Sequence, residues 1–118
     1  NSLRGGIPAS QVIRDLAAIK EKCRANNIRP IFLTLPPINP EAITRAFNED
    51  TVTNWRSEFD RVNDFIRQQP YYIELEPYFS DENRELPALY AIDGLHLDIE
   101  GKKLIAQIIK ANWPRVTR

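Results

Sequence analysis

The sequence predicts an α/β fold in three layers, with helices on both faces of a parallel sheet, and two observations predict it. Segments with helical periodicity alternate with short apolar runs, in the order helix, strand, one or two helices, strand, loop, helix. The two runs, RPIFLTLPP and YYIEL, resemble strands covered on both faces by helices. Since helices join the strands, right-handed crossovers would make them parallel.

The first helix is predicted over residues 8–26. Pro8 suits a first helical turn, and apolar side chains recur on one face of the segment. A strand follows at residues 31–35 and ends before the Pro36-Pro37 pair, which we expect to shape a loop at the carboxyl end of that strand. The apolar face consists of Val12, Ile13, Leu16, Ile19 and Cys23.

Two more helices and a second strand are predicted in the middle of the chain. A short helix is expected over residues 41–48, and a longer one, capped by Asp50 or Thr51, is expected to reach Gln68. YYIEL, which follows Pro70, then forms the second strand.

The last predicted helix begins near Ile99, with Asp98 as its N-cap, and ends before Pro114. Residues 1–118 contain neither a repeat nor a linker, so they are interpreted as a single domain. Two strands are fewer than the roughly four of a usual sheet. The sequence therefore predicts the C-terminal portion of an α/β domain, and the lack of methionine favours a processed or trimmed chain.

Composition excludes several classes of function. Sixteen basic and sixteen acidic residues cancel, so net charge favours neither a nucleic-acid partner nor an anionic membrane. No apolar run approaches the ~20 residues of a transmembrane helix. One cysteine cannot form an internal disulfide, and Cys23 is expected to be a buried structural residue. No metal-ligand spacing is present, so neither a metal nor another cofactor is expected. The sequence does not indicate a cellular compartment.

The only histidine, His96, follows Asp93 by three residues, just ahead of the last helix. It could be an exposed loop residue. Alternatively, Asp93 and His96 could form the acid and base of a catalytic triad, in which the carboxylate fixes the tautomer and orientation of the ring. Gly94 would permit the tight turn between them, and Leu95 and Leu97 could anchor it by packing.

Two longer segments resemble a known family. IDGLHLDIEGKKLIAQII resembles the last block of the SGNH, or GDSL-type, esterases and lipases, in which an Asp precedes a His by three residues and a helix follows. PASQVIRDLAAIKEKCRANNIRPIFLTLPP resembles the helix and strand after the family's Gly-x-Asn-Asp block. The resemblance implies a three-layer, flavodoxin-like parallel sheet, present here as its C-terminal portion.

The resemblance also assigns roles. Asp93 falls on the triad acid, His96 on the general base, and Asn1 on the asparagine that stabilises the oxyanion. The family's nucleophilic serine lies in a Gly-Asp-Ser-type block, which these residues lack. Four serines occur outside any such context: Ser2, Ser10, Ser57 and Ser80.

The resemblance thus implies part of a serine ester hydrolase that cleaves acyl or acetyl esters of small molecules such as acylated sugars or lipids. The 118 residues alone are expected to be inactive and to pair with a companion chain or a second copy. Tyr90, Leu95 and Trp55 could line an acyl or sugar pocket, although Trp55 is first of all a core residue.

Two alternatives remain open. A non-catalytic, flavodoxin-like binding module would need no serine. A cysteine hydrolase would need Cys23 within hydrogen-bond reach of His96.

Overall fold

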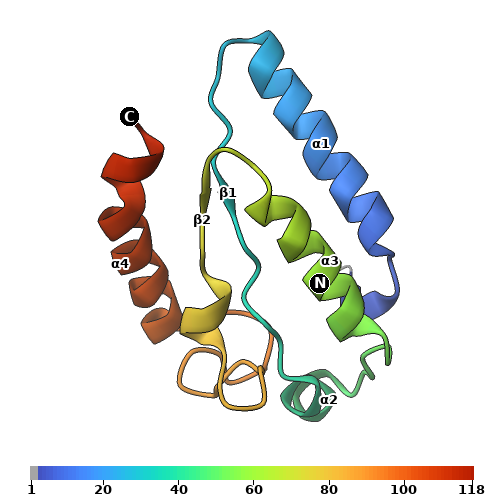
Figure 1. Cartoon of the computed structure of the whole chain (residues 1–118). Coiled ribbons are helices and arrows are strands. Elements are labelled where there is room, and N and C mark those ends of the chain that lie inside the picture. Colours follow the sequence, from blue (N-terminus) through green and yellow to red (C-terminus); the bar gives the residue numbers. More distant parts are fainter. Residues whose placement is uncertain (1–2) are drawn as a thin grey trace.

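The computed structural model describes residues 3–118 and is dominated by helices (Figure 1). Helix α1 is followed by strand β1, helices α2 and α3, strand β2 and the long C-terminal helix α4. Two short 3-10 helices, η1 and η2, precede α1 and follow β2. The elements are η1 (Leu3–Gly5), α1 (Ala9–Ala25), β1 (Phe32–Leu33), α2 (Pro40–Phe47), α3 (Trp55–Arg67), β2 (Tyr72–Ile73), η2 (Glu76–Phe79) and α4 (Ile99–Val116).

The strands pair in parallel, with Phe32 opposite Tyr72 and Leu33 opposite Ile73. The parallel direction of the two strands is as predicted, but the prediction of a three-layer fold with a flavodoxin-like sheet is wrong. The described chain is mostly helical, and its sheet has only two strands of two residues each.

Side chains and prolines explain why the strands are so short. Prolines flank both apolar runs, and proline has no N–H to donate to a ladder. Beyond β1, the Thr34 hydroxyl accepts hydrogen bonds from the backbone N–H groups of Leu75 (2.7 Å) and Glu76 (3.2 Å). The Asn63 side chain similarly binds both the N–H and the C=O of Leu35. Side chains thus take over where a longer strand would continue.

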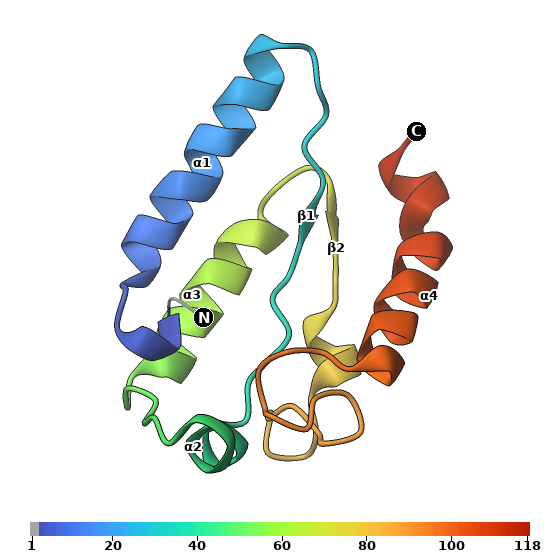
Figure 2. The ribbon, with the colours of Figure 1, turned by 180° about the vertical axis from the view of Figure 1, so that it is seen from behind.

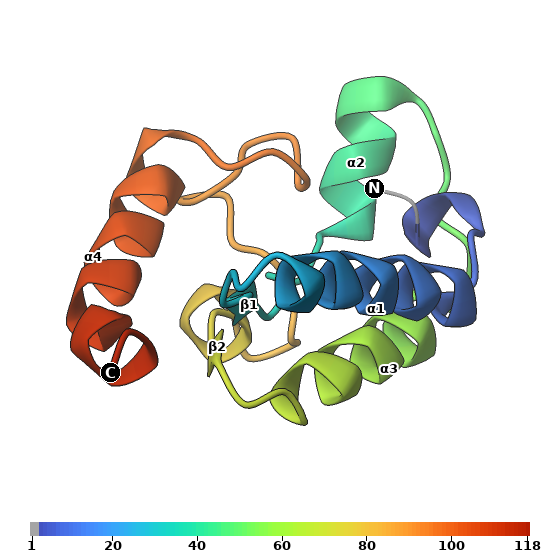
Figure 3. The ribbon, with the colours of Figure 1, turned by 90° about the horizontal axis from the view of Figure 1, so that it is seen from above.

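Two apolar clusters hold the strands between helices (Figures 2 and 3). One lies between the strands and α4 and includes Ile73, Leu75 and Ile108, all buried. The other joins α1 and α3 to the opposite side of the strands, around Phe32 and Val62. Because the strands are parallel, their carboxyl ends lie together, at the end of the molecule that also holds α2 and the loop before α4 (Figure 1).

Two helix boundaries differ from the prediction. Helix α3 begins at Trp55, three or four residues later than expected from a cap at Thr51 or Asp50, because the N–H of Val52 binds the carbonyl of Arg4 and holds that segment against η1. Helix α4 continues through Pro114 to Val116. Pro114 has no N–H to donate to the carbonyl of Lys110. The helix nevertheless continues to Val116, which is fully buried and whose carbonyl accepts a hydrogen bond from Arg29.

Within residues 3–118, no helix combines the length and hydropathy needed to cross a bilayer.

Candidate active-site loop

Asp93 and His96 lie on a tight turn between η2 and α4, and the Asp93 carboxylate forms that turn. Its Oδ1 accepts hydrogen bonds from the backbone N–H groups of Leu95 and His96, each 2.8 Å long. Its Oδ2 lies 3.0 Å from Nδ1 of the His96 ring. One carboxylate therefore fixes both the backbone of the turn and one nitrogen of the imidazole.

The rest of the ring is open. The side chain of His96 is 66% exposed, and its edge contacts the Phe47 ring at a centroid distance of 6.1 Å. Among residues 3–118, no group forms a hydrogen bond with Nε2. The nitrogen opposite the carboxylate can thus accept a proton from a group that approaches from solvent.

The carboxylate is held in its ionised form. Partial burial of Asp93 raises the pKa of its carboxyl group, but the N–H groups of His96 and Leu95, together with the His96 ring, outweigh burial and lower that pKa below its ordinary value. A charged Asp93 favours the tautomer with the proton on Nδ1, which leaves Nε2 as the basic nitrogen.

Gly94 docks the turn onto helix α2. Its φ of +79° lies in the region that favours glycine, and a Cβ there would stand 2.6 Å from the Asn39 carbonyl oxygen and 2.8 Å from the Cβ of Ala42. The carbonyl of Gly94 accepts from the N–H of Asn39 at 2.9 Å. The predicted turn-forming role of Gly94 is confirmed, and this close contact explains why no larger residue fits.

Asp98 closes the loop at its other end, in a way that differs from the prediction. It occupies the N-cap position of α4, but its side chain makes no capping bond. Its Oδ2 instead accepts from the N–H of Ile92 at 2.8 Å, and its own N–H binds the Tyr90 carbonyl at 2.7 Å. Gly101 permits this approach, since a Cβ would lie 2.9 Å from that carbonyl oxygen. Residues 92–98 therefore form a loop tied at both ends.

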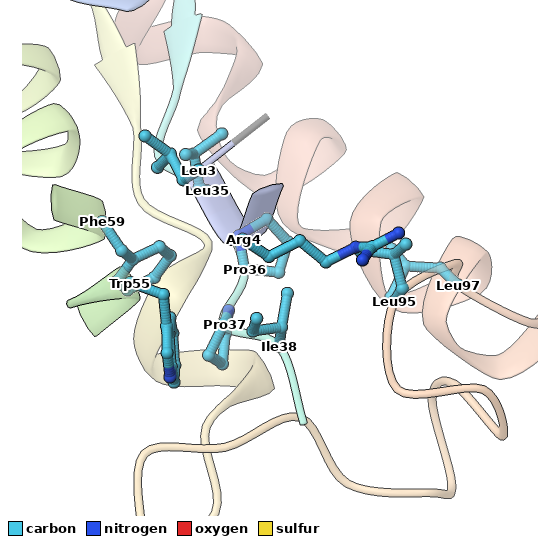
Figure 4. A pocket seen from close by; sticks show the side chains of 10 residues that line it. All are labelled: Leu3, Arg4, Leu35, Pro36, Pro37, Ile38, Trp55, Phe59, Leu95 and Leu97. Carbon is cyan, nitrogen blue, oxygen red and sulfur yellow. The ribbon is translucent and has the colours of Figure 1, made fainter. Parts of the chain in front are cut away.

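An apolar pocket of about 180 Å³ adjoins the loop (Figure 4). The loop contributes Leu95 and Leu97, which flank His96 in the sequence, and α3 contributes Trp55 and Phe59. Trp55 is only 8% exposed, so it is both a core residue and a pocket residue. Tyr90 packs edge-on against Phe79 in the core and does not line the pocket. The other lining residues are Leu3, Arg4, Leu35, Pro36, Pro37 and Ile38.

The structure brings none of the serines in residues 3–118 to His96. Asn1 and Ser2 lie outside the described residues. The hydroxyls of Ser57 and Ser80 donate to nearby backbone carbonyls of their own segments, and no contact joins either residue, or Ser10, to His96.

Cys23 is also distant from the loop. It is half-buried and lies near the C-terminal end of α1, at the opposite end of the molecule from the loop before α4 (Figure 1). Within residues 3–118, no three His, Cys, Asp or Glu side chains gather closely enough to hold a metal ion.

A second charged group, the glutamate cluster, was not predicted. It comprises Glu74, Glu76, Arg67, Arg84 and Asp60 at the carboxyl end of β2. Glu76 accepts from Arg67 (3.0 Å) and Arg84 (3.0 Å), and Glu74 accepts from Arg67 at 2.7 Å. Arg84 also binds Asp60 at 2.6 Å. The signal in the sequence was that Glu74 lies in the second predicted strand and Glu76 directly follows it, and in the structure Glu76 begins η2.

The cluster holds its glutamates ionised. Burial raises the pKa of both carboxyl groups, but the hydrogen bonds that Glu76 accepts from Arg84, Asn63 and Arg67 outweigh burial and lower its pKa. The bonds from Arg67 and Thr34 do the same for Glu74.

Comparison with known proteins supports the fold. No family model and no curated protein matches the sequence. A solved structure described as "a putative platelet activating factor from Streptococcus pneumonia" superposes with a TM-score of 0.74 at 18% sequence identity. The match covers 94% of this chain and 54% of the other, so the chain spans about half the length of that protein. Over the matched residues this chain therefore has the fold of part of that protein.

Proposed function

We propose that this chain supplies the acid and the base of an SGNH-type serine ester hydrolase. In this proposal Asp93 is the triad acid and His96 the general base. The nucleophilic serine would lie on a segment outside these 118 residues, either elsewhere in the same protein or on a companion chain. The likeness to the Streptococcus structure supports a hydrolase-type fold but does not identify a reaction.

The hydrogen-bonded pair of Asp93 and His96 carries the proposal. A triad base needs one ring nitrogen bound to a carboxylate and the other free to meet a hydroxyl. The 3.0 Å contact at Nδ1 and the open Nε2 meet both requirements. The pair also stands beside an apolar pocket at the carboxyl ends of the strands, where α/β proteins commonly bind ligands.

The chemistry follows from these positions. The serine hydroxyl attacks the ester carbonyl and gives its proton to Nε2 of His96, and Asp93 stabilises the resulting imidazolium. His96 then returns the proton to the leaving alcohol, and water cleaves the acyl-serine by the same sequence. Asn1 is proposed from its place in the sequence as a donor to the oxyanion.

The proposed substrate is an acyl or acetyl ester of a small molecule, such as an acylated sugar or lipid. Leucine, proline, phenylalanine and tryptophan side chains line most of the pocket, so it suits the apolar part of an ester. A volume of about 180 Å³ accommodates a short acyl group.

Hydrolysis of p-nitrophenyl acetate tests the proposal, with the full-length protein and the 118-residue chain assayed side by side. We expect turnover by the full-length protein only. A fluorophosphonate should then label a single serine outside residues 1–118, located by mass spectrometry of the digested protein.

Two results would contradict the proposal. One is a label on Ser10, Ser57 or Ser80, which would place the nucleophile where no contact reaches His96. The other is a full-length protein that neither hydrolyses the ester nor takes the label, which would favour a non-catalytic binding module.

A further inference from the structure

Helix α4 has a second apolar face that packs against nothing in the described chain. Its inner face packs on the strands through Leu104, Ile105 and Ile108. At 100° per residue, the opposite side of the helix carries five residues that recur at intervals of three or four. We call this side the outer face. It consists of Ile99, Lys103, Ala106, Lys110 and Trp113, all exposed.

The two large apolar side chains of the outer face are mostly exposed. Ile99 is 68% exposed and Trp113 is 53% exposed, whereas the other tryptophan, Trp55, is 8% exposed. A shallow hollow between Ala106 and Trp113 also exposes part of Ile109. A partner that covered this indole and this isoleucine would remove apolar surface from water, which is favourable.

Apolar exposure continues from α4 onto the loop of residues 92–98. Ile92 is 76% exposed, and its N–H binds the Asp98 carboxylate at 2.8 Å, which places it beside the first turn of α4. Leu89, three residues earlier, is 65% exposed. The exposed apolar side chains thus extend from the outer face to the loop that carries His96.

The charge of α4 indicates the chemistry of the partner. The whole chain has no net charge, yet α4 contains four basic residues and one acidic residue, Glu100. Glu100 lies 3.5 Å from Lys103. Lys102 and Lys110 form no ion pair with any residue in the described range 3–118. The outer face therefore combines apolar side chains with excess positive charge, a combination complementary to anionic lipid headgroups.

We propose that α4 binds along the surface of an anionic lipid membrane through its outer face. Ile99 and Trp113 insert at the level of the headgroups, where an indole meets both apolar and polar surroundings. The lysines extend their apolar stems along the interface and direct their ammonium groups to lipid phosphates. Such a helix lies on the membrane rather than crossing it.

Sedimentation of the full-length protein with vesicles tests the proposal without any need for catalysis. The vesicles contain two parts phosphatidylcholine to one part phosphatidylglycerol, with pure phosphatidylcholine as the neutral comparison. Binding to the anionic vesicles is expected to weaken in about 1 M salt, which shortens the screening length from ~10 to ~3 Å.

Variants of the outer face sharpen the test. Lys103→Gln with Lys110→Gln should weaken binding by roughly fivefold for each lysine, since one lysine near an anionic surface contributes about 1 kcal/mol. Trp113→Ala should weaken it by about tenfold through lost apolar burial. The matched control removes two positive charges from α1, on the other side of the strands, by Arg14→Gln with Lys22→Gln (Figure 3).

The outcomes separate this proposal from its alternatives. Binding that needs anionic lipid, falls in both outer-face variants and survives in the control supports it. Equal binding to neutral vesicles, or none to either kind, overturns it. Self-association that Trp113→Ala abolishes, without any lipid binding, also overturns it in favour of a second copy. Hydrolysis of soluble p-nitrophenyl acetate reports on the proposed active site separately, because Lys103 and Lys110 belong to neither the pair nor the pocket.

Discussion

The loop of residues 92–98 and the glutamate cluster both hold carboxylates whose pKa is lowered, but only the loop leaves a proton-accepting nitrogen without a partner among residues 3–118. In the cluster, Glu76 is almost fully buried, and both of its oxygens accept hydrogen bonds from cluster arginines. In the loop, both oxygens of the Asp93 carboxylate have partners within the turn, whereas the Nε2 of the mostly exposed His96 ring has none among residues 3–118. A shifted pKa therefore does not distinguish a structural network from a candidate active site, whereas an unsatisfied atom at a surface does.

Replacement of His96 should produce the largest effect and act on activity alone. His96→Gln removes the proposed base, so kcat/KM for p-nitrophenyl acetate should fall by a factor on the order of 10⁴ or more. Because the ring is mostly exposed, the midpoint of urea unfolding should not change. A variant with kcat/KM within tenfold of the wild type would remove His96 from the mechanism.

Gly94→Ala should affect both activity and stability. The new Cβ would collide with the Asn39 carbonyl and with Ala42, so the loop must move away from α2. A displacement of about 1 Å at a catalytic group costs on the order of 10² in rate, and we expect that loss in kcat/KM. Gly5→Ala is the matched control, since nothing lies within 4 Å of its added Cβ. Equal activity of the two variants would show that the docking of the loop does not position His96.

Glu76→Gln should act on stability alone, in contrast to His96→Gln. The neutral amide of glutamine cannot compensate the charges of Arg67 and Arg84. Its NH₂ group would also face an arginine N–H donor, where Glu76 has an acceptor oxygen. We expect a loss of about 2 kcal/mol in the free energy of unfolding by urea, with kcat/KM changed less than about threefold. Glu82→Gln, an exposed carboxylate, should change neither quantity. A large fall in kcat/KM for folded Glu76→Gln protein would assign the cluster a part in catalysis.

The smallest effect is the response of stability to acid. Glu74 and Glu76 have folded-state pKa values below the ordinary 4.5, so the stability they contribute is fully present above that pH. It is lost as the pH falls below 4.5 and through the lower folded-state values. Urea unfolding from pH ~6 to pH ~3 should show a decline whose slope reaches at most about 1.4 kcal/mol per pH unit for each proton taken up on unfolding. Glu76→Gln should decline less steeply, and an identical slope would mean that the cluster does not titrate on unfolding.

Local patterns in the sequence predicted the helices well. Helical periodicity over residues 8–26 corresponds to α1 at Ala9–Ala25, and the segment at 41–48 corresponds to α2 at Pro40–Phe47. The extent of the sheet could not be predicted in the same way. The hydrogen bonds that end the strands come from Thr34 and Asn63, and Asn63 lies 28 residues from its backbone partner at Leu35.

The candidate site shows the same division. The spacing of Asp93 and His96 is local, so the sequence was enough to suggest that the two side chains meet. The recess beside Asn39 that accepts Gly94 depends on tertiary packing, which the local sequence does not show. The bond from Ile92 to Asp98 depends on which N–H group the carboxylate binds, and residue spacing leaves that choice open. Asp98 was expected to cap α4 because aspartate commonly does so, but the N–H of Ile92 competed successfully for its carboxylate.

The ties at both ends of residues 92–98 have a consequence for protein engineering. The hydrogen bonds that orient the imidazole and its carboxylate all lie within seven consecutive residues, with Asp93 shaping the turn and Asp98 closing it. A graft of this heptapeptide before a helix of another scaffold would therefore carry its acid and base already aligned. The recipient needs only a recess without side chains to receive Gly94 and a small residue one turn into the helix, as at Gly101.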